Sequence, residues 1–456
     1  MKTIWNLLPN KPLCQYVASF CVTLITLCIG LHFGWTSPYM PFLLSEESSI
    51  RMTDEQASWV AVIYLIAGPC GTLTAPFLSN AFGRKPTLMC ASVIFTISWL
   101  VLAFASRFSE LLVVRFMAGA NEGIIFSTTP VYLAEILHKN IRGLICSLLC
   151  VAAVTGILIM NILGSYLTIR DSSFVSLTIP ITSLLIFIWM PESPNYFIMK
   201  GEKEKAKKCL IKLRPLTEVE AELEDIAKSV DDKPIKLLDF FLSKIYRKRL
   251  LVLTGLQAFQ QLSGISAITI YAQTVFKETT DAISPLMAVA VLHSVEAIFS
   301  AISSLLIDKV GRRPLLIAST TIVAITLLVI GTYYYLTTEE YIDAKQIEWL
   351  PISCFVVFII AYSFGLLTVP TFIAGEIFPT NLRSHAGAFA NFSYFVIAFV
   401  ASKFFQVTKD TYGKHVPFLT FGLFSILGLI FIIYFIPETK NKSLHEIQLE
   451  LKRSNS

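Results

Sequence analysis

Long apolar runs alternate with short charged segments along the whole chain. About twelve of the runs reach the roughly 20 residues that a helix needs to cross a bilayer. They lie near residues 13–36, 57–79, 87–106, 109–136, 143–168 and 174–191, and again near 249–277, 282–307, 314–336, 349–378, 384–407 and 416–436. The pattern predicts an all-α integral membrane protein with twelve transmembrane helices.

The polar segments between the runs occur twice, in the same order. The matching pairs are NAFGRKP at 80–86 with DKVGRRP at 308–314, Glu135 and Arg142 with Glu376 and Arg383, and PES at 191–193 with PET at 437–439. A duplicated apolar chain with charges at its joints is typical of membrane transporters built from two similar halves.

The repeat predicts how the chain divides into two bundles, a linker and a tail. We expect residues 1–194 and 249–438 to form two pseudo-symmetric six-helix bundles. Residues 195–248 hold most of the remaining charge, and we expect them to form a cytoplasmic linker with amphipathic helices against the bundle ends or the anionic leaflet. A solvated linker is the alternative. Residues 439–456 would be a cytoplasmic tail.

The distribution of basic residues predicts the orientation. Nine of the 37 Lys and Arg residues fall on one face of the predicted topology and the remaining 28 on the other. The nine are Arg51, Arg107, Arg115, Arg170, Lys277, Lys345, Lys403, Lys409 and Lys414. Because cytoplasmic loops carry the excess of Lys and Arg, we expect both termini in the cytoplasm. The net charge of +5 therefore reflects topology and predicts no binding to nucleic acid.

Composition supports a membrane protein and no catalytic role. The chain is 54% hydrophobic and 15% charged, with a mean hydropathy of +0.66, whereas soluble domains are about 45–50% apolar and about 25% charged. Neither the six His nor the nine Cys residues show metal-binding spacing, and no Gly-rich phosphate loop is present. We expect no enzyme activity, cofactor or metal. The first apolar run lacks a small-residue cleavage site after it, so we expect a retained span.

The ordered motifs resemble those of the sugar porters of the major facilitator superfamily. Besides the repeated pairs, they are Arg115-x3-Gly119, Pro130-x-Tyr132-x2-Glu135, Gln260-Gln261-Leu262-Ser263-Gly264 and Glu376-Ile377-Phe378-Pro379-x3-Arg383. The segment Gly34-Trp35-Thr36-Ser37-Pro38 is most similar to the insect trehalose facilitator branch. The resemblance implies the major facilitator fold, with a central substrate site that opens alternately to each side.

Two adjacent amides point to a binding site for a neutral, hydroxyl-rich solute. Gln260 and Gln261 both donate and accept hydrogen bonds inside an apolar run, although such amides also join helices to one another. Gly264 follows them and can let the span bend as a gate. The resemblance implies that Gln260 and Gln261 contact sugar hydroxyls and that Tyr271 closes over the substrate.

The remaining predicted contacts depart from the family pattern. Ser266 stands where Asn is usual, Thr371 where Trp is usual, and Tyr394-Phe395 where Asn-Trp are common. We place Ser266, Thr371 and Trp35 in the substrate site with Gln260, Gln261 and Glu296.

Two carboxylates lie inside predicted spans, where an unpaired charge is costly and marks a functional candidate. Glu122 lies two turns after Arg115, and the two can form an intramembrane ion pair. Glu296 has His293 one turn earlier as its nearest titratable neighbour. Glu296 is then a hydrogen-bond acceptor facing the substrate, a proton-binding group, or a partner of an amide such as Gln260.

Acidic and basic residues recur at predicted cytoplasmic helix ends, where we expect a charge latch. Its residues are Arg84, Lys85, Glu135, Arg142, Asp308, Arg312, Arg313, Glu376 and Arg383. Pairs that bridge the bundles would seal the cytoplasmic side in one state and separate in the other. Local helix capping with ordinary positive-inside charge is the alternative.

These patterns predict a multi-pass uniporter of the plasma membrane that moves a sugar, such as trehalose or a hexose, by alternating access. Thr36 follows Trp35 where proton-driven relatives carry Asp, which favours facilitated diffusion. A proton symporter, a carrier of a non-sugar solute and a sugar sensor with little transport remain alternatives. The expected partners are a small-molecule sugar or polyol and the lipid bilayer, with no obligate protein partner.

Overall fold

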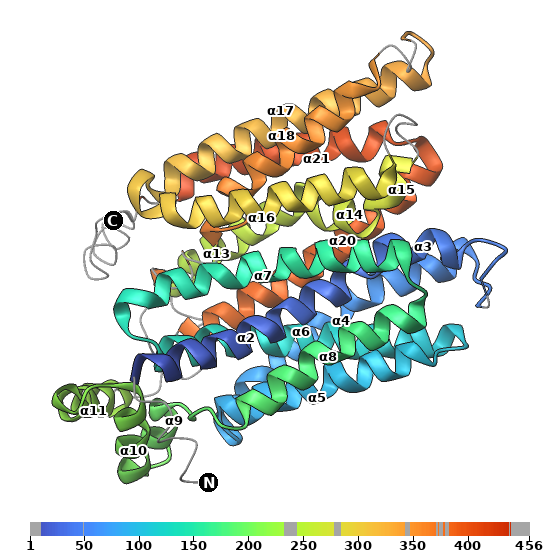
Figure 1. The fold of residues 1–456 in the computed structure, drawn as a ribbon. Coiled ribbons are helices and arrows are strands. Elements are labelled where there is room, and N and C mark those ends of the chain that lie inside the picture. Colours follow the sequence, from blue (N-terminus) through green and yellow to red (C-terminus); the bar gives the residue numbers. More distant parts are fainter. Residues whose placement is uncertain are drawn as a thin grey trace.

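A computed structural model describes residues 11–48, 50–231, 244–277, 284–342, 347–370, 373, 377–378, 383–436 and 438. The helices form two groups that lie side by side, one from each half of the chain (Figure 1). Ten helices of the described residues are long and apolar enough to cross a membrane. The all-α fold predicted from the apolar runs is therefore confirmed.

The first group contains seven helices. They are α2 (Lys11–Gly34), α3 (Thr36–Leu43), α4 (Asp54–Ala81), α5 (Arg84–Ala103), α6 (Phe108–Ile136), α7 (Lys139–Tyr166) and α8 (Ile169–Phe187). Helices α2 and α3 together form the first predicted span, with Trp35 at the junction.

Small residues bring the backbones of this group close together. A Cβ atom on Gly71 of α4 would lie 1.7 Å from the carbonyl oxygen of Ala120 in α6. A Cβ on Gly119 of α6 would lie 2.0 Å from the carbonyl oxygen of Tyr64 in α4. Small residues are enriched where helices pack in lipid, because they let the backbones approach closely. The pair α4 and α6 therefore holds Tyr64, Arg115 and Glu122 in fixed positions.

The second group contains more short helices than the first. Its helices are α13 (Lys244–Leu262), α14 (Ile265–Ile270), α15 (Ala272–Lys277), α16 (Pro285–Val310), α17 (Arg312–Thr338), α18 (Trp349–Phe364), α20 (Arg383–Tyr412) and α21 (His415–Phe435). The expected span 249–277 is thus divided into α13, α14 and α15. The expected span 349–378 is a regular helix only as far as Phe364, and residues 371–372, 374–376 and 379–382 lie outside the described part.

Gly264 divides α13 from α14. Its φ of +81° lies in the left-handed region that glycine adopts readily. A Cβ at this position would also lie 2.3 Å from the ring of Phe421 in α21. The span therefore bends immediately after Gln260 and Gln261, at a position that a larger side chain could not occupy without displacing α21.

Three short helices follow the first group: α9 (Pro194–Met199), α10 (Lys203–Leu213) and α11 (Leu216–Asp231). They lie together at one end of the bundle, which we call the linker end (Figure 1). Helix α10 is amphipathic, since it buries Ala206, Cys209, Leu210 and Leu213 while its Lys residues face outward. The Gln15 amide of α2 donates to the carbonyl oxygen of Leu213 at 2.8 Å, so α10 contacts the end of α2.

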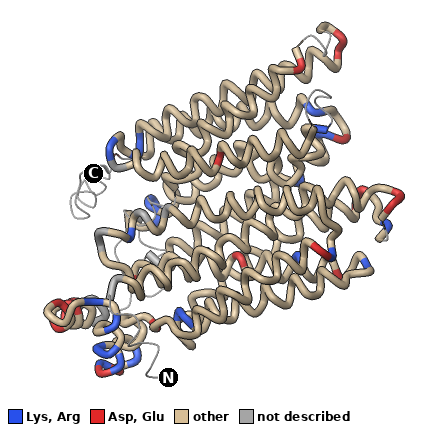
Figure 2. The backbone as a smooth tube through the Cα atoms, viewed as in Figure 1, with Lys and Arg blue, Asp and Glu red and all other residues tan. Residues whose placement is uncertain are grey.

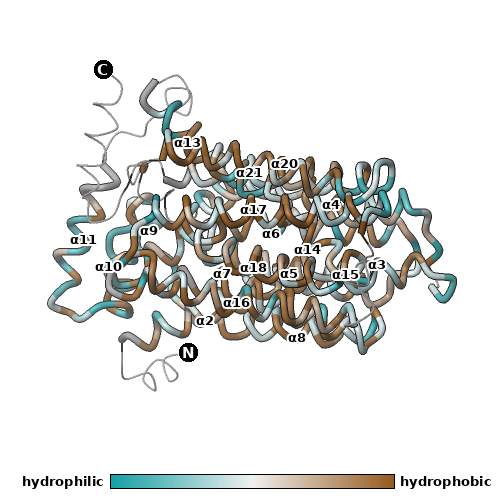
Figure 3. Tube along the Cα trace, turned by 90° about the horizontal axis from the view of Figure 1, so that it is seen from above, coloured by the Kyte–Doolittle hydropathy of each residue, from teal (hydrophilic) through white to brown (hydrophobic). Residues whose placement is uncertain are grey.

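Charge and hydropathy follow this arrangement. Charged residues gather at the two ends of the bundle, with few along the middle of the helices (Figure 2). Apolar positions predominate along the long helices, whereas hydrophilic positions concentrate at the linker end and in the loops of the opposite end (Figure 3). Large apolar side chains such as Phe77 and Tyr434, 76% and 79% exposed, lie on the outer surface as expected for contact with lipid.

Candidate functional site

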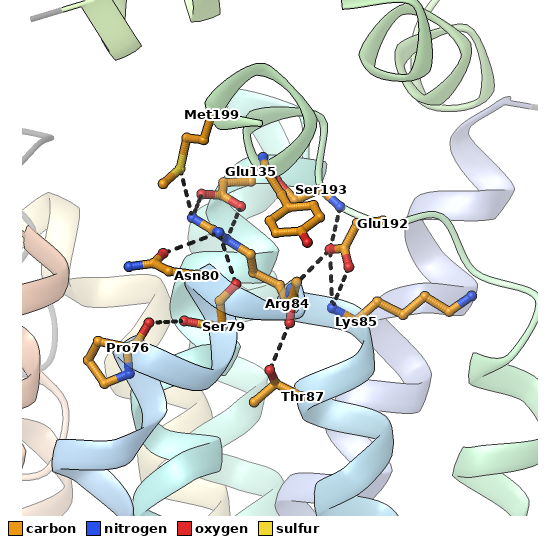
Figure 4. Close-up of polar contacts among 12 residues, drawn as sticks. Pro76, Ser79, Asn80, Arg84, Lys85, Thr87, Glu135, Glu192, Ser193 and Met199 are labelled. Atoms are coloured by element: carbon orange, nitrogen blue, oxygen red, sulfur yellow. Dashed lines mark hydrogen bonds and ion pairs between the residues drawn. The ribbon is translucent and has the colours of Figure 1, made fainter. Parts of the chain in front are cut away.

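Arg84 lies at the centre of a charge cluster at the linker end (Figure 4). Its guanidinium binds both oxygens of Glu135 in α6, at 3.0 and 3.2 Å. It also donates to the carbonyl oxygen of Ser79 at 3.2 Å and to the side chain of Asn80 at 3.4 Å. The fork geometry of Arg suits this two-oxygen contact, which joins α5 to α6 within the first half.

Glu192 holds the start of α5 through the backbone. Its carboxylate accepts hydrogen bonds from the backbone N–H groups of Arg84 and Lys85, each at 3.1 Å, and of Ser193 at 2.7 Å. Burial raises the pKa of the Glu192 carboxyl, whereas the N–H donors and Arg84 lower it. The Lys85 ammonium donates to the carbonyl oxygen of Ile188 at 2.6 Å.

The second half repeats this arrangement. Glu438 accepts from the backbone N–H groups of Arg312 and Arg313, each at 3.1 Å. Arg313 donates to the carbonyl oxygen of Ile433 at 2.6 Å, as Lys85 does to Ile188. Glu192 and Glu438 were absent from the predicted site, although the repeated PES and PET motifs marked both.

The structure describes the side chains of some of the other predicted latch residues and not of others. Arg142 donates to the carbonyl oxygen of Leu137 at 3.4 Å. Glu376 lies outside the described residues, and so do the side chains of Asp308 and Arg383. Four ion pairs at the linker end, Arg84–Glu135, Lys205–Glu202, Lys207–Glu220 and Arg214–Glu222, join groups of the first half or of the linker helices.

A central polar cluster surrounds the end of α13. Gln260 donates to the Tyr362 hydroxyl of α18 at 3.2 Å, and Ser266 donates to the Gln261 side-chain oxygen at 2.5 Å. Tyr394 of α20 lies beside Gln261 and Ser266. The structure thus brings Gln260, Gln261 and Ser266 together as predicted residues of one site, and it adds Tyr362. Thr371 lies outside the described residues.

Both amides keep an open hydrogen-bonding atom. Gln260 Oε1 and Gln261 Nε2 have no partner among the described residues, although Gln260 is 5% and Gln261 0% exposed. An unmatched buried polar atom costs about 1–3 kcal/mol. These two atoms can therefore bind a ligand hydroxyl as acceptor and donor.

Glu296 lies in α16 and contacts His293 of the same helix. The carboxylate and the His293 Nδ1 atom are 2.9 Å apart. His293 is fully buried and its Nε2 atom has no partner in the described part of the chain. The structure places Gln260 on Tyr362 instead of on Glu296, and Glu296 lies within electrostatic reach of Tyr362 and Tyr394.

Arg115 and Glu122 do not form the ion pair that their spacing suggests. Arg115 Nε donates to the carbonyl oxygen of Val60 at 3.3 Å, and Nη1 donates to the carbonyl oxygen of His32. Its guanidinium carbon lies 4.5 Å from the ring centre of Tyr64. Glu122 Oε2 has no hydrogen-bond partner among the described residues, and Tyr64 lies beside it. Backbone carbonyls of α2 and α4 thus take two of the Arg115 donors, while Nη2 has no hydrogen-bond partner among the described residues and Arg115 lies within electrostatic reach of Glu122.

Trp35 is fully buried in the first half. Its ring centre lies 5.8 Å from the Arg115 guanidinium carbon and 5.4 Å from the Tyr39 ring centre. It therefore packs in the wall formed by α2 and α3, and α14, which carries Ser266, contacts both of these helices.

An outer network joins the two halves at the end opposite the linker helices. It consists of Ser58 of α4, Tyr271 at the end of α14, and Lys403 and Gln406 of α20. The Gln406 side-chain oxygen accepts from Ser58 and, at 3.1 Å, from Tyr271, while Lys403 donates to Ser58 at 2.6 Å. Only Tyr271 was predicted. A lone Lys403 inside an apolar run was a sequence signal for that residue, but not for Ser58 or Gln406.

Gln273 adds a second contact between the halves at this end. Its backbone N–H donates to Ser37 at 3.3 Å, and its amide donates to Ser165 of α7 at 3.1 Å. This end of the bundle is therefore closed by polar contacts around the start of α15.

The described residues contain no group of three or more His, Cys, Asp or Glu side chains arranged to hold a metal. The site that the structure does assemble is a set of amides, hydroxyls and carboxylates between two helix groups. Such a set can bind a small polar solute through hydrogen bonds.

Comparison with known proteins identifies the family that this chain resembles. The model of the family described as "Sugar (and other) transporter" matches residues 16–451. The chain is 32% identical to proteins named facilitated trehalose transporter Tret1 from Culex quinquefasciatus and Bombyx mori, over 96% of this chain and 86% of each relative. It is 33% identical to the Tret1 of Anopheles gambiae, of whose length the matched region spans 56%.

Solved structures agree on the fold. The proton:xylose symporter XylE bound to 6-bromo-6-deoxy-D-glucose has a TM-score of 0.81 at 22% identity, covering 97% of this chain and all of XylE. An inward open conformation of XylE from E. coli has a TM-score of 0.78 at 21% identity, covering 96% of this chain and 99% of that one. The protein is thus a multi-pass membrane protein of the major facilitator fold. It belongs to the sugar transporter family.

Proposed function

We propose that this protein is a facilitative uniporter that moves a sugar, such as trehalose or a hexose, across the plasma membrane by alternating access. The two helix groups, within residues 1–194 and 249–438, would rock against each other around the central polar cluster. The linker end, with residues 195–248 and both termini, would face the cytoplasm. The tail 439–456 would lie on the same side.

The observation that carries the proposal is the pair of open amide atoms beside the bend at Gly264. Gln260 Oε1 and Gln261 Nε2 offer one acceptor and one donor between the two groups, with Tyr362 and Tyr394 alongside. Hydroxyl groups of a sugar both donate and accept, so they complement these atoms. The names of the Tret1 relatives support a sugar over other polar solutes.

The contacts between the halves support alternating access. At the opposite end, Ser58, Tyr271 and Gln406 join the two groups. At the linker end, the described ion pairs stay within the first half or the linker. A transporter that is closed at the end opposite the linker helices has this pattern of contacts. The predicted latch would form its bridging pairs in the other state.

The first span supports uniport. Trp35 is followed by Thr36, whose hydroxyl donates to the carbonyl oxygen of Phe33 at 3.3 Å. The position after Trp35, whose ring lies beside Arg115, therefore offers no carboxylate that could bind a proton. The second candidate is proton symport, which the buried contact between His293 and Glu296 favours, because such a pair can share a proton.

Uptake measurements separate these functions. Labelled trehalose, glucose and fructose would be offered to oocytes that express the protein, at neutral and acidic external pH, with water-injected oocytes as the background. Saturable uptake of one sugar at a rate independent of pH supports the uniporter. Uptake that rises in acid would replace it with the symporter. Surface expression without uptake of any sugar would contradict both.

A further inference from the structure

A line of polar side chains runs from the amide pair toward the outer end, along one face of α14 and α15. Its members are Ser266, Thr269 and Gln273, which we call the polar stripe. Residues three and seven positions apart lie on the same face of an α-helix. The backbone N–H groups of Tyr271 and Val275 donate to carbonyl oxygens four residues earlier, at 3.0 and 2.9 Å. The helical path therefore continues from α14 into α15, and the three side chains share one face.

The polar stripe is longer than one sugar ring. Ser266 and Gln273 are seven residues apart, so with a rise of about 1.5 Å per residue they lie about 10 Å apart along the helix. Ser266 donates to the Gln261 side-chain oxygen at 2.5 Å and is thus part of the amide cluster. The length from there to Gln273 corresponds to two joined pyranose rings, whereas a single hexose beside Gln261 covers only its inner part.

The first half places polar side chains opposite the outer part of the polar stripe. The Gln273 amide donates to Asn161 Oδ1 at 3.4 Å and to Ser165 at 3.1 Å, and its backbone N–H donates to Ser37 at 3.3 Å. Asn161 and Ser37 are 0% and 1% exposed, and both lie inside membrane-spanning segments. Helices α3 and α15 lie at the end of the bundle opposite the linker helices (Figure 1). Polar groups of both halves thus meet between the amide pair and the outer end.

These contacts have to separate when the outer end opens. Gln273 belongs to the second half, whereas Asn161, Ser165 and Ser37 belong to the first, and alternating access moves the halves apart at this end. Amide and hydroxyl groups then face each other across the opening. Such groups bind sugar hydroxyls both as donors and as acceptors, so a ring that enters there replaces the hydrogen bonds that the halves lose.

We propose that Gln273 and Asn161 form a second sugar subsite and that the preferred substrate is therefore a disaccharide. One ring binds the open atoms of Gln260 and Gln261. The second ring lies on the outer side of the first and bonds Gln273 of one half and Asn161 of the other. A hexose occupies the inner subsite alone. This inference rests on the proposed function, because it concerns which sugars the transporter selects.

The test compares trehalose, which has two rings, with glucose, which has one. Initial rates of uptake of each labelled sugar would be measured over a range of external concentrations in oocytes that express the protein. The wild type should show a half-saturation concentration for trehalose about tenfold below that for glucose, because the second ring adds one or two hydrogen bonds. Unlabelled trehalose should compete with glucose at the same low concentration.

Variants assign the difference to the second subsite. Gln273→Leu keeps a side chain of similar size and removes the amide. It should raise the half-saturation concentration for trehalose about tenfold and change that for glucose less than twofold. Asn161→Ala should act in the same direction from the other half. The matched control is Gln406→Leu, which removes an amide that joins the halves at this end but belongs to α20 and not to the polar stripe. It should change the values for the two sugars by a similar factor.

Each result decides a separate point. If Gln273→Leu changes the values for trehalose and glucose by the same factor, as Gln406→Leu does, Gln273 serves closure alone and the inference is overturned. Uptake of a hexose without uptake of trehalose or competition by it would also overturn the inference, and would leave sugar transport standing. If surface-expressed wild type takes up neither trehalose, glucose nor fructose, the proposed function itself fails. Should Gln273→Leu not reach the surface, the wild-type comparison and Asn161→Ala decide.

Discussion

At the scale of single residues, Gly83 and Gly311 determine the backbone geometry of the charged segments at the starts of α5 and α17. Gly83 and Gly311 have φ values of +110° and +106°, in a region that is essentially reserved for glycine. A Cβ on Gly83 would lie 2.2 Å from Glu192 Oε2, and one on Gly311 would lie 2.9 Å from Glu438 Oε2. Each glycine thus lets a carboxylate reach the backbone N–H groups at the start of the next helix.

Gly83→Ala should therefore lower the free energy of unfolding of the first half by about 1–3 kcal/mol from backbone strain, with a further loss from displacing Glu192. Thermal unfolding of the detergent-solubilised protein measures this. Gly201→Ala is a matched control for strain alone, since Gly201 has a φ of +77° but open space around it. Gly143→Ala controls for the added methyl group in a helix. Equal melting temperatures for Gly83→Ala and Gly143→Ala would contradict the role of the glycine.

At the scale of elements, the apolar runs predicted the long helices. A segment in lipid must pair its own backbone N–H and C=O groups, and a helix does so. The amphipathic pattern near residues 202–211 likewise predicted α10. The outer network could not be predicted, because Ser58 and Gln406 lie 348 positions apart and each is an ordinary polar residue in its own helix. The spacing of Arg115 and Glu122 suggested a pair, but a sequence does not reveal competing backbone carbonyls on other helices.

Tyr271, at the end of α14, links the broken span to the outer network through its hydroxyl. A substitution that removes only this hydroxyl therefore tests the network. Tyr271→Phe keeps the ring, which stacks on Phe405 at 5.9 Å, and removes the donor to Gln406. Loss of one such bond, worth about 1 kcal/mol, should shift the population toward states open at this end by about fivefold.

Spin labels report this shift as a distance. Labels at Glu55→Cys and Tyr412→Cys, at the outer ends of α4 and α20, would be measured in a background without Cys70 and Cys90. Tyr271→Phe should increase the longer-distance population. Tyr341→Phe, a change at a 71% exposed tyrosine, is the control. The same distance distribution in all three proteins would exclude Tyr271 as part of the closure.

At the scale of the whole molecule, the sequence repeat becomes a repeat of atomic contacts. Glu192 and Glu438 bind equivalent backbone groups in the two halves, and Lys85 and Arg313 bind equivalent carbonyls. Because each half holds its own charged joint together, either can move as a unit. The linker helices bind the first half through Arg214, which donates to the carbonyl oxygen of Ile136 at 2.9 Å.

The distribution of Lys and Arg predicts that the linker end faces the cytoplasm. A glycosylation acceptor inserted between α3 and α4, near Glu46, should be glycosylated, and the same insertion between α10 and α11, near Pro215, should not. The mobility shift on glycosidase treatment measures this. Glycosylation of only the second insertion would show that the linker end faces outward. The outer network would then lie on the cytoplasmic side.

Transport without coupling is the central claim, and purified protein in liposomes tests it most directly. Uptake of labelled trehalose or glucose would be followed with and without an inward proton gradient, at zero membrane potential. The account predicts that the internal concentration reaches the external one and stops there, with the same plateau under the gradient. Accumulation above the external concentration when protons flow inward would contradict uniport and make the protein a symporter.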